Sequence, residues 1–403
     1  MKPSILFFVP EHYENLVTKG VENMVFERNT NDFFKKVITV HPLCYKTRSM
    51  KLSDSFDLFE IGFDLVPNEK RNRLLIYLQL PVHFIRVIWR SVRLVKKFKI
   101  DLIRANDPYW MGFFAYIVSK ICKTPFCVSI HADYEKRMQL DKNLTMCSVF
   151  GSYKLAKYLE RFILSKAPLI MPIRQTLGLK AVANSADPEK VRIIPHGIDL
   201  SPFTLPPKHN IHSLFGLNPD SKIISFAGRF SKENYIYDII ETAQKLGQKR
   251  DDFIFVMTGG GKEEQKVKTI AEKDTFLKSH MFFTGYQQRD VCFDIRRASY
   301  ISLCLMSGFS LIEACAAAHP VVAYDVEWHS ELVRNNETGF LAKENDVDGI
   351  VKALDWLLDH PEESEKMGQK AKALAFECHD LKKTSDIQSQ WYSELLNQGK
   401  NGD

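Results

Sequence analysis

The chain has 403 residues, a formal net charge of +6 and 45% hydrophobic residues. This length excludes a single ordinary core and predicts two domains, and the hydrophobic content is typical of a soluble globular protein. The charge is uneven, because residues 1–200 contain 31 Lys and Arg against 19 Asp and Glu (+12), whereas the remainder contains 24 against 30 (−6). A basic first half suits an anionic membrane surface, a lipid phosphate or nucleic acid as its partner.

The eight cysteines form no C-x-x-C or Cys/His zinc pattern, and several lie in apolar runs, as reduced core cysteines do. The first ten residues lack the features of a signal peptide. The longest uncharged run, 298–312, has 15 residues and is short for a membrane-spanning helix. These features predict a cytoplasmic protein, peripheral on the inner face of the cytoplasmic membrane at most.

The first half alternates apolar runs with helical patterns, which favours parallel sheets. A polar loop is expected over 11–19, followed by a helix that begins at Gly20 and ends near Phe34. The predicted strands are 5–9, 36–42, 58–66, 100–105, 126–130, 169–172 and 191–195.

The segment from Leu74 to Lys99 is predicted to be one amphipathic helix with Trp89 near the boundary of its faces. Its basic positions recur at spacings of four, three and four, and are Arg86, Arg90, Arg93 and Lys97. Its apolar positions are expected on the opposite side, and are Phe84, Ile85, Ile88, Val92 and Val95. Two interpretations remain: an interfacial helix attracted to anionic lipid, or a domain helix with its basic face in water.

His131 follows the predicted strand 126–130 and is followed by Asp133. Doubly wound sheets bind ligands at the carboxyl ends of their strands, so this imidazole is a candidate for contact with substrate hydroxyls. A histidine in this place is also often structural.

The second half opens with Leu200 to Leu217, which contains three prolines and is interpreted as a linker. The strands expected after it are 222–227, 253–257, 300–306 and 321–324, and helices are expected over 311–318 and 384–396. Asp346 and Asp348 form a D-x-D pattern, but they begin an amphipathic segment, where helix capping explains them better than a metal does. No metal site and no nucleic-acid motif is predicted.

The tight turn Ser307 to Ser310 joins a buried strand to a helix that carries Glu313 one turn inside. Free N–H groups and the helix dipole make such a turn an anion site, where the carboxylate could bind sugar hydroxyls. The same letters also fit the capping box S-x-x-E, in which Glu313 only closes the helix end. A hydrolase elbow would need G-x-S-x-G, which is absent.

The run GFSLIEACAAAHPVVAYD and the segments 330–333 and 337–341 resemble the signature of the family 4 (group 1) glycosyltransferases. That resemblance implies the GT-B fold, which has two facing Rossmann-like domains. It implies that Glu313 binds the ribose of a nucleotide-sugar. The family's first glutamate, which contacts the donor sugar, is replaced by Leu305 or, with a two-residue deletion, by Ser307.

The resemblance also implies a donor site in the second domain. Arg229 would hold the pyrophosphate, because a guanidinium forks onto phosphate oxygens. The family's lysine is replaced by Asn234, followed by Tyr235 where glycine is common, and Lys232 is the substitute. Gly285 would lie near the base. The amides of the turn would complete the site, and they belong to Gly308, Phe309, Ser310 and Leu311.

In the first domain, the resemblance places the acceptor near Gly20, His131 and Asp133. A single glycine before a helix is also ordinary. The expected division is 1–199 for acceptor binding, 200–383 for the nucleotide-sugar, and a helix in 384–403 that packs back on the first domain; the segment Pro195 to Asp199 resembles the family's P-N-G-V-D boundary.

The resemblance implies transfer of a hexose with retention of the anomeric configuration and without a metal, and the basic first half predicts a lipid-carrier-linked or surface-polysaccharide precursor as the acceptor. The donor is a substrate, and no separate cofactor is predicted. An epimerase of the same fold and a non-catalytic nucleotide-sugar-binding subunit remain alternatives. The missing first glutamate and the replacement at Asn234 keep the second alternative open.

Overall fold

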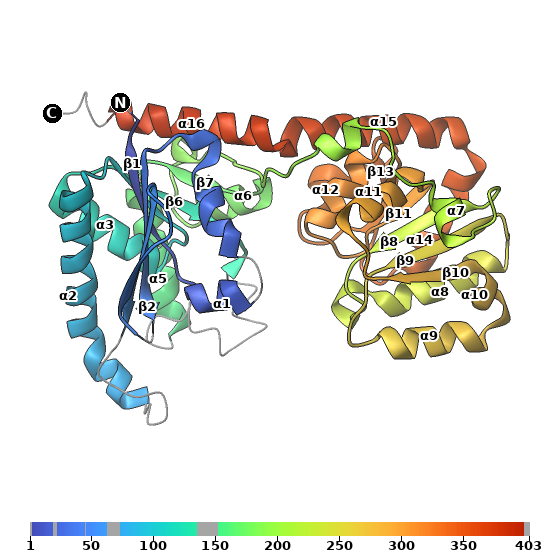
Figure 1. The fold of residues 1–403 in the computed structure, drawn as a ribbon, viewed down its shortest axis with the longest axis horizontal. Coiled ribbons are helices and arrows are strands. Elements are labelled where there is room, and N and C mark those ends of the chain that lie inside the picture. The colour runs from blue at the N-terminus through green and yellow to red at the C-terminus, as the bar shows by residue number, and fades with distance from the viewer. Residues whose placement is uncertain (1, 19–21, 45, 63–72, 135–151, 399–403) are drawn as a thin grey trace. The chain divides into compact units, whose positions relative to one another are not determined.

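The computed structural model describes residues 2–18, 22–44, 46–62, 73–134 and 152–398. The chain forms two compact units: Met1–Pro195 with Thr384–Asp403, and His196–Lys383. Each contains a largely parallel sheet with helices on both faces, so the predicted α/β class is confirmed (Figure 1).

The first unit contains a seven-stranded sheet in the order β3-β4-β2-β1-β5-β6-β7. All neighbouring pairs are parallel except the edge pair β3 and β4. The central strands are apolar runs buried on both faces, as a covered parallel sheet requires. The strands are β1 Ser4–Phe8, β2 Lys36–Cys44, β3 Arg48–Lys51, β4 Phe56–Gly62, β5 Leu102–Ala105, β6 Phe126–Ile130 and β7 Ile170–Pro172.

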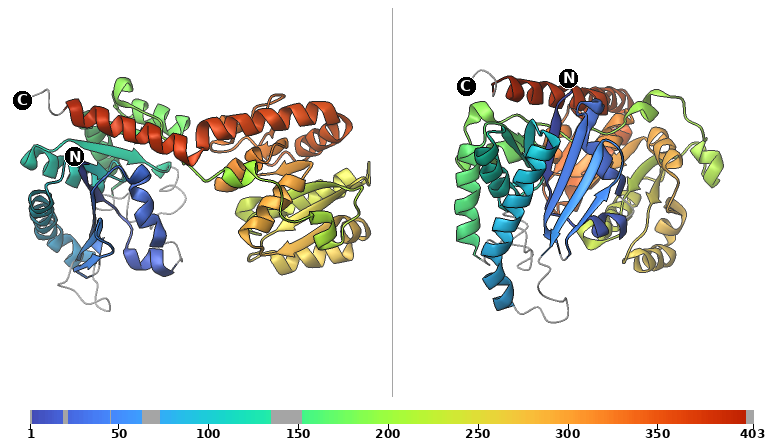
Figure 2. Two further views of the ribbon diagram at one scale, coloured as in Figure 1. Left: turned by 45° about the horizontal axis from the view of Figure 1, so that its top comes forward. Right: turned by 60° about the vertical axis from the view of Figure 1, so that its left-hand side comes forward.

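Helices cover the two faces of this sheet unequally (Figures 1 and 2). One face packs on α2 (Arg73–Phe98), α3 (Trp110–Cys122) and α5 (Tyr153–Lys166). The other packs on the 3-10 helix η1 (Glu22–Arg28) and on α16 (Leu381–Gln398), whose Tyr392 and Leu395 join the core formed by Ile5 and Phe7. The remaining helices of this unit are α1 Tyr13–Thr18, η2 Thr30–Asp32, α6 Gln175–Ala183 and η4 Pro188–Lys190.

Several expectations for the first unit were wrong. The polar loop after β1 contains the short helix α1, and the antiparallel strand β3 was not predicted at all. The expected strand 191–195 is an extended segment: Arg192 and Ile194 donate backbone hydrogen bonds to β7, but the only bridge is between Ile170 and Val191. Pro172, at the end of β7, and Pro195 have no N–H to donate, and β7 has only three residues. Too few backbone groups therefore pair to form a strand.

The second unit contains a six-stranded, wholly parallel sheet in the order β10-β9-β8-β11-β12-β13. Its strands are β8 Lys222–Ala227, β9 Phe253–Thr258, β10 Met281–Gly285, β11 Ile301–Leu303, β12 Val321–Tyr324 and β13 Gly339–Ala342. Its helices are η5 Ser201–Thr204, α7 Ile211–Phe215, η6 Lys232–Asn234, α8 Ile236–Gly247, α9 Glu264–Lys273, α10 Thr275–His280, α11 Arg289–Ala298, α12 Phe309–Ala316, α13 His329–Leu332, α14 Val347–Asp359 and α15 Pro361–His379.

The segment 200–217 is not a free linker. Leu200 and Phe203 are buried against α12 and α15, and Ile211 and Leu217 pack on β8 and β9. The expected cap is confirmed, because the Asp346 carboxylate accepts from the Gly349 N–H at 2.9 Å at the start of α14.

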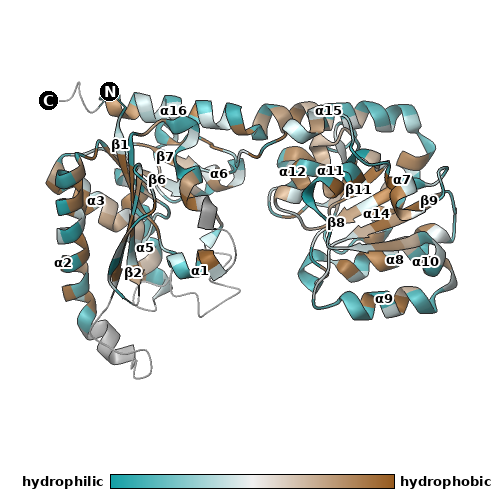
Figure 3. Ribbon diagram, in the orientation of Figure 1, coloured by the Kyte–Doolittle hydropathy of each residue, from teal (hydrophilic) through white to brown (hydrophobic). Residues whose placement is uncertain are grey.

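Helix α2 presents apolar and basic side chains on the same outer face. Figure 3 shows hydrophobic and hydrophilic residues along its ribbon. Val82, Ile85 and Trp89 are 57%, 68% and 51% exposed. Ile85 was therefore wrongly assigned to the inner face. The Arg93 guanidinium lies 3.5 Å from the centre of the Trp89 ring. Among the described residues, no helix is both long enough and apolar enough to cross a membrane.

Candidate functional site

The carboxyl edge of the second sheet brings the turn before α12 against the end of β8. Gly308 is the N-cap of α12, and the Ser310 hydroxyl, in the first turn, donates to the Ala227 carbonyl at 2.8 Å. Ala227 is the last residue of β8, two positions before Arg229. The hydrogen bond therefore fixes the arginine turn beside the N-terminus of α12.

The Glu313 carboxylate lies against a buried arginine of α11. Arg296 is 3% exposed, and its Nε lies 3.3 Å from Glu313 Oε2. Its Nη2 also donates to Ser310 Oγ at 2.7 Å. The capping-box interpretation is therefore wrong. The N-cap of α12 is Gly308, and the side chains of Ser310 and Glu313 contact β8 and α11 instead of closing the helix end. The ion pair orients the Glu313 carboxylate, and the Glu313 side chain is still 20% exposed.

The backbone amides of this turn are not all available to a ligand. The Leu311 N–H donates to the Gly308 carbonyl at 3.1 Å, and the Leu311 side chain is wholly buried. Leu311 therefore belongs to the core, and the amides that α12 offers are those of Phe309 and Ser310. Phe309 is 51% exposed, and its ring centre lies 5.2 Å from that of His196.

The open space at Gly308 distinguishes it from a structural glycine. A Cβ built on Gly308 would meet no atom within 4 Å. A Cβ on Gly259, by contrast, would lie 2.1 Å from the Gly228 carbonyl oxygen. Packing within the protein thus explains the second glycine but not the first. The open space beside Gly308 leaves room for a ligand to approach the backbone.

Arg229 and Lys232 are exposed at the same edge of the sheet. The Asn234 side chain, which replaces the expected lysine, donates to the Arg229 carbonyl at 2.8 Å and closes the turn. Within the described ranges, the Arg229 guanidinium makes no hydrogen bond or ion pair. This asparagine therefore shapes the turn, and the exposed Arg229 and Lys232 place two positive charges at this edge, a charge that suits an anion.

The buried residue His329 holds the turn before α12 in place through two hydrogen bonds. His329 is 0% exposed; its Nδ1 donates to the Tyr324 carbonyl at 2.9 Å, and its Nε2 accepts from the Ser307 N–H at 3.1 Å. The imidazole therefore ties the end of β12 to the residue before Gly308.

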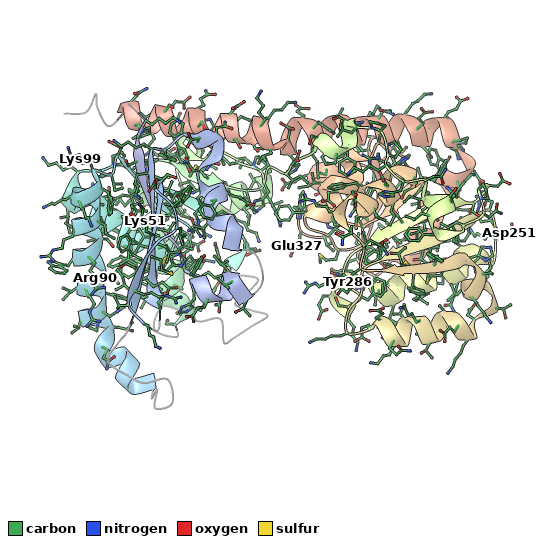
Figure 4. The ribbon with its side chains drawn as sticks, viewed as in Figure 1. Lys51, Arg90, Lys99, Asp251, Tyr286 and Glu327 are labelled. Atoms are coloured by element: carbon green, nitrogen blue, oxygen red, sulfur yellow. The ribbon has the colours of Figure 1, made fainter. Side chains whose placement is uncertain are left out.

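Gly285 ends β10 with a φ of +68°, a conformation that favours glycine. Its carbonyl accepts from the Gly259 N–H at 2.9 Å. The next residue, Tyr286, is 77% exposed and projects from the unit (Figure 4). The three strand ends β8, β9 and β10 thus meet beside an exposed aromatic ring.

The sequence-predicted residues of the first unit lie at the carboxyl edge of its own sheet. His131 follows β6 and is half-buried. The Asp133 carboxylate forms an ion pair with Lys180 of α6, and the Tyr134 hydroxyl donates to the Asn106 carbonyl at 3.2 Å. Asp133 is thus tied to α6. Gly20 lies outside the described residues.

Sequence reasoning missed Arg296, His329 and Tyr286. Arg296 has an arginine neighbour and an aspartate two positions before it, so its sequence looks like a solvated helix end. His329 comes from a four-residue helix without a clear pattern. For Tyr286, an aromatic residue directly after a strand-ending glycine was the available signal.

Comparisons with known proteins bear on this arrangement. Residues 208–374 match the family model for glycosyl transferases group 1, and residues 13–202 match that for glycosyltransferase family 4. This chain belongs to the family 4 (group 1) glycosyltransferases. The family assignment that the sequence motifs predicted is therefore confirmed.

Relatives of this glycosyltransferase cover it to different extents. An uncharacterized glycosyltransferase of Haemophilus influenzae is 30% identical over 43% of this chain and 49% of its own length. This chain thus spans about half the length of that relative. The UDP-Gal:alpha-D-GlcNAc-diphosphoundecaprenol alpha-1,3-galactosyltransferase of Escherichia coli is 25% identical over 65% of this chain and 67% of its own.

The fold also matches solved structures. Anabaena Alr3699/HepE, crystallised in complex with UDP, superposes with a TM-score of 0.66 at 15% identity, covering 98% of this glycosyltransferase and 100% of that chain. With the two largely parallel sheets, this likeness confirms the predicted GT-B fold.

Proposed function

We propose that this protein transfers a hexose from a nucleotide-diphosphate sugar to an acceptor that is a lipid-carrier-linked or surface-polysaccharide precursor. The Ser310 to Ala227 hydrogen bond carries the proposal, because it places a helix N-terminus, the Arg229 turn and Glu313 at one sheet edge. Those groups match the charges of a nucleoside diphosphate and its ribose.

In this proposal the diphosphate lies between Arg229, Lys232 and the amides of Phe309 and Ser310. The guanidinium and the helix dipole stabilise the negative charge that develops on the leaving group. Glu313, held by Arg296, accepts hydrogen bonds from the ribose hydroxyls. Tyr286 offers an aromatic face to the base.

Retention of the anomeric configuration belongs to the same proposal. A double displacement needs a carboxylate nucleophile at the donor sugar. Leu305 is wholly buried and Ser307 has no carboxylate, so neither position of the family's first glutamate supplies one. The acceptor hydroxyl then attacks from the face on which the diphosphate departs, and His131 is the proposed contact with the reacting sugars.

The acceptor assignment rests on charge. The first 200 residues carry a balance of +12, which suits a phosphate-linked acceptor. The Escherichia coli relative acts, by its name, on a diphosphoundecaprenol acceptor. Both observations favour a lipid phosphate carrier over a neutral free sugar.

A peripheral membrane contact through α2 fits such an acceptor. The helix contains no Asp or Glu, and Val82, Ile85 and Trp89 are exposed on a face with Arg93. Arg90 lies along α2 and Lys99 just beyond it (Figure 4). Apolar side chains that enter the headgroup region and cations that meet anionic lipid are the two components of interfacial binding.

The donor site is tested by thermal shift with a panel of nucleoside diphosphates and nucleotide-sugars. A ligand that binds the native state raises the melting temperature by mass action. One nucleotide should stabilise the wild type and not Arg229→Ala. Lys278→Ala, which removes one positive charge from α10 ahead of β10, should respond like the wild type. No shift with any nucleotide would contradict the proposal.

Transfer itself is tested by following the sugar of the nucleotide that binds. Release of nucleoside diphosphate should require a polyprenyl-diphosphate-linked acceptor, and the product should keep the anomeric configuration. Release of an altered free sugar without acceptor would favour an epimerase instead.

The membrane contact is tested by flotation with anionic and neutral vesicles. Anionic vesicles should carry the wild type upward, and Ile85→Glu with Trp89→Glu should abolish flotation. The matched pair Tyr158→Glu with Leu155→Glu, exposed on α5, should not. Equal, negligible binding of the wild type to both vesicles would overturn this part.

A further inference from the structure

The first unit contains a cluster of basic side chains on the sheet face covered by η1 and α16. Phe7 of β1 pairs with Thr39 on one side and with Arg104 on the other, so these three side chains share a face. His41 is two residues beyond Thr39 on β2 and points the same way. Arg28 reaches this face from the last turn of η1.

Arg104 is held in a fixed orientation. Its Nε donates to Ser129 Oγ at 2.6 Å, and its Nη1 donates to the Tyr392 hydroxyl of α16. The guanidinium carbon lies 5.4 Å from the centre of the Phe7 ring. These contacts leave its Nη2 without a hydrogen bond among the described residues, while the residue as a whole keeps some exposure.

Arg28 has a buried nitrogen without a hydrogen-bond partner. Its Nη1 is inaccessible to solvent and meets no acceptor in the described part of the chain. Burial, and then the neighbouring charge of Arg104, lower the pKa of Arg28 to about 10, and the Glu11 carboxylate opposes this with a smaller effect. The positive charge is therefore destabilised where it lies.

His41 presents an unused acceptor in the same cluster. It is 1% exposed, and its Nδ1 donates to the Glu11 carbonyl, which leaves Nε2 as a lone-pair acceptor without a partner. Burial, and then the charge of Arg28, lower the pKa of His41 to about 3, so the ring is neutral at physiological pH.

A buried donor beside a buried acceptor, with two guanidinium charges, defines what this cluster can bind. Nε2 repels a bare anion but accepts from a hydroxyl, and Arg28 Nη1 donates to an oxygen. The Glu11 carboxylate offsets only part of the destabilisation of Arg28, and a bridging water would satisfy both atoms without adding negative charge. A phosphate that carries a sugar supplies both the charge and the hydroxyl.

We infer that Arg28, Arg104 and His41 form a sugar-phosphate site, in which the phosphate lies against the two guanidinium groups and a sugar hydroxyl donates to His41 Nε2. The site rests on the proposed function to the extent that a phosphate-linked acceptor would occupy it. A free sugar phosphate has the same chemistry and is the other source of the ligand.

Calorimetric titration of the full chain with glucose 1-phosphate tests the site. The wild type should bind, and Arg28→Gln should weaken binding at least tenfold. Arg28→Lys should weaken it less, because it keeps the charge but loses the planar fork. Arg161→Gln is the matched control, since it removes the same charge from α5 on the opposite face of the sheet, and its affinity should not change.

Further probes separate the contributions and the sources. Inorganic phosphate and methyl glucoside should each bind more weakly than glucose 1-phosphate. Polyprenyl-phosphate glucose in detergent should bind more tightly than glucose 1-phosphate if the natural ligand is the phosphate-linked acceptor. The two compounds should bind equally if the natural ligand is a free sugar phosphate.

Absence of glucose 1-phosphate binding, or equal binding by the wild type and Arg28→Gln, would overturn the site. The nucleoside-diphosphate melting shift should remain unchanged in every variant. A lost shift would instead report failure of the donor site, so the two proposals fail separately.

Discussion

The Nε atom of Arg296 lies 3.3 Å from the carboxylate Oε2 of Glu313. The arginine is 3% exposed, so its charge depends on this carboxylate and on its hydrogen bond to Ser310 for compensation. The same carboxylate is the proposed ligand of the donor ribose. One ion pair thus connects the stability of the second unit to its binding chemistry.

Glu313→Gln keeps the side-chain shape and removes its charge. Loss of one partner of a buried pair costs about 3–5 kcal/mol, and the partial exposure of Glu313 reduces the expected loss of unfolding free energy to about 1–3 kcal/mol. Donor affinity should fall at least tenfold, as measured by titration at a temperature where the variant is folded. Glu241→Gln, which breaks an exposed pair with Lys245, should change neither quantity. Unchanged donor affinity in Glu313→Gln would refute the ribose assignment.

Ser310→Ala removes two hydrogen bonds at once: the one donated to the Ala227 carbonyl and the one accepted from Arg296. Because the half-buried Ala227 carbonyl and a buried guanidinium N–H both lose a partner, the unfolding free energy should fall by about 1–3 kcal/mol in urea titrations. Ser279→Ala, on the exposed side of α10, should cost about 0.5 kcal/mol or less. Similar losses of unfolding free energy in Ser310→Ala and Ser279→Ala would show that the two Ser310 hydrogen bonds do not stabilise the fold more than an exposed serine does.

The sequence predicted what depends on local apolar patterns. Strand β8 begins at Lys222 and ends at Ala227 as expected, because a short apolar run is bounded by polar residues and a glycine. The N-cap role of Asp346 was predictable for the same reason, since the groups that satisfy it lie within three residues.

The role of Ser310 and Glu313 could not be predicted in this way. The letters S-x-x-E suit both a capping box and the observed network, and Arg296 decides between them from another helix. Ile85 illustrates the same limit. Periodicity places it next to an apolar stripe, but the width of the covered face decides whether it is buried, and it is 68% exposed.

Gly308→Ala separates a ligand requirement from a folding requirement. Gly308 has φ −97° and ψ −115°, and Tyr109 adopts nearly the same angles, φ −103° and ψ −115°, with a full side chain. A Cβ at Gly308 meets open space, so the unfolding free energy should change by about 0.5 kcal/mol or less. Donor affinity should fall at least tenfold, because the methyl group would occupy space beside the amides of Phe309 and Ser310.

Gly259→Ala is the contrasting variant. Its Cβ would lie 2.1 Å from the Gly228 carbonyl oxygen, and its φ is +121°, so the unfolding free energy should fall by about 2–4 kcal/mol. Equal stability losses in the two glycine variants would contradict a ligand requirement at Gly308.

Asp107 predicts a pH dependence of stability in the first unit. It is 3% exposed, and burial raises its pKa to about 7, although its Oδ1 accepts from the N–H groups of Tyr109 at 2.8 Å and Met111 at 3.2 Å. The raised pKa means that the folded state holds this proton more tightly than the unfolded state. Its contribution is therefore fully present below about pH 4 and is lost as the pH rises to about 7.

Asp107→Asn keeps an oxygen that can accept from both N–H groups and removes the ionisation. The unfolding free energy of the wild type minus that of the variant should fall by up to about 4 kcal/mol between pH 4 and pH 7 and then stay level. Urea titrations at pH 4, 5, 6, 7 and 8 measure this difference. A difference that rises with pH, or that stays constant across the range, would show that Asp107 is ionised in the folded protein and that its two N–H partners outweigh its burial.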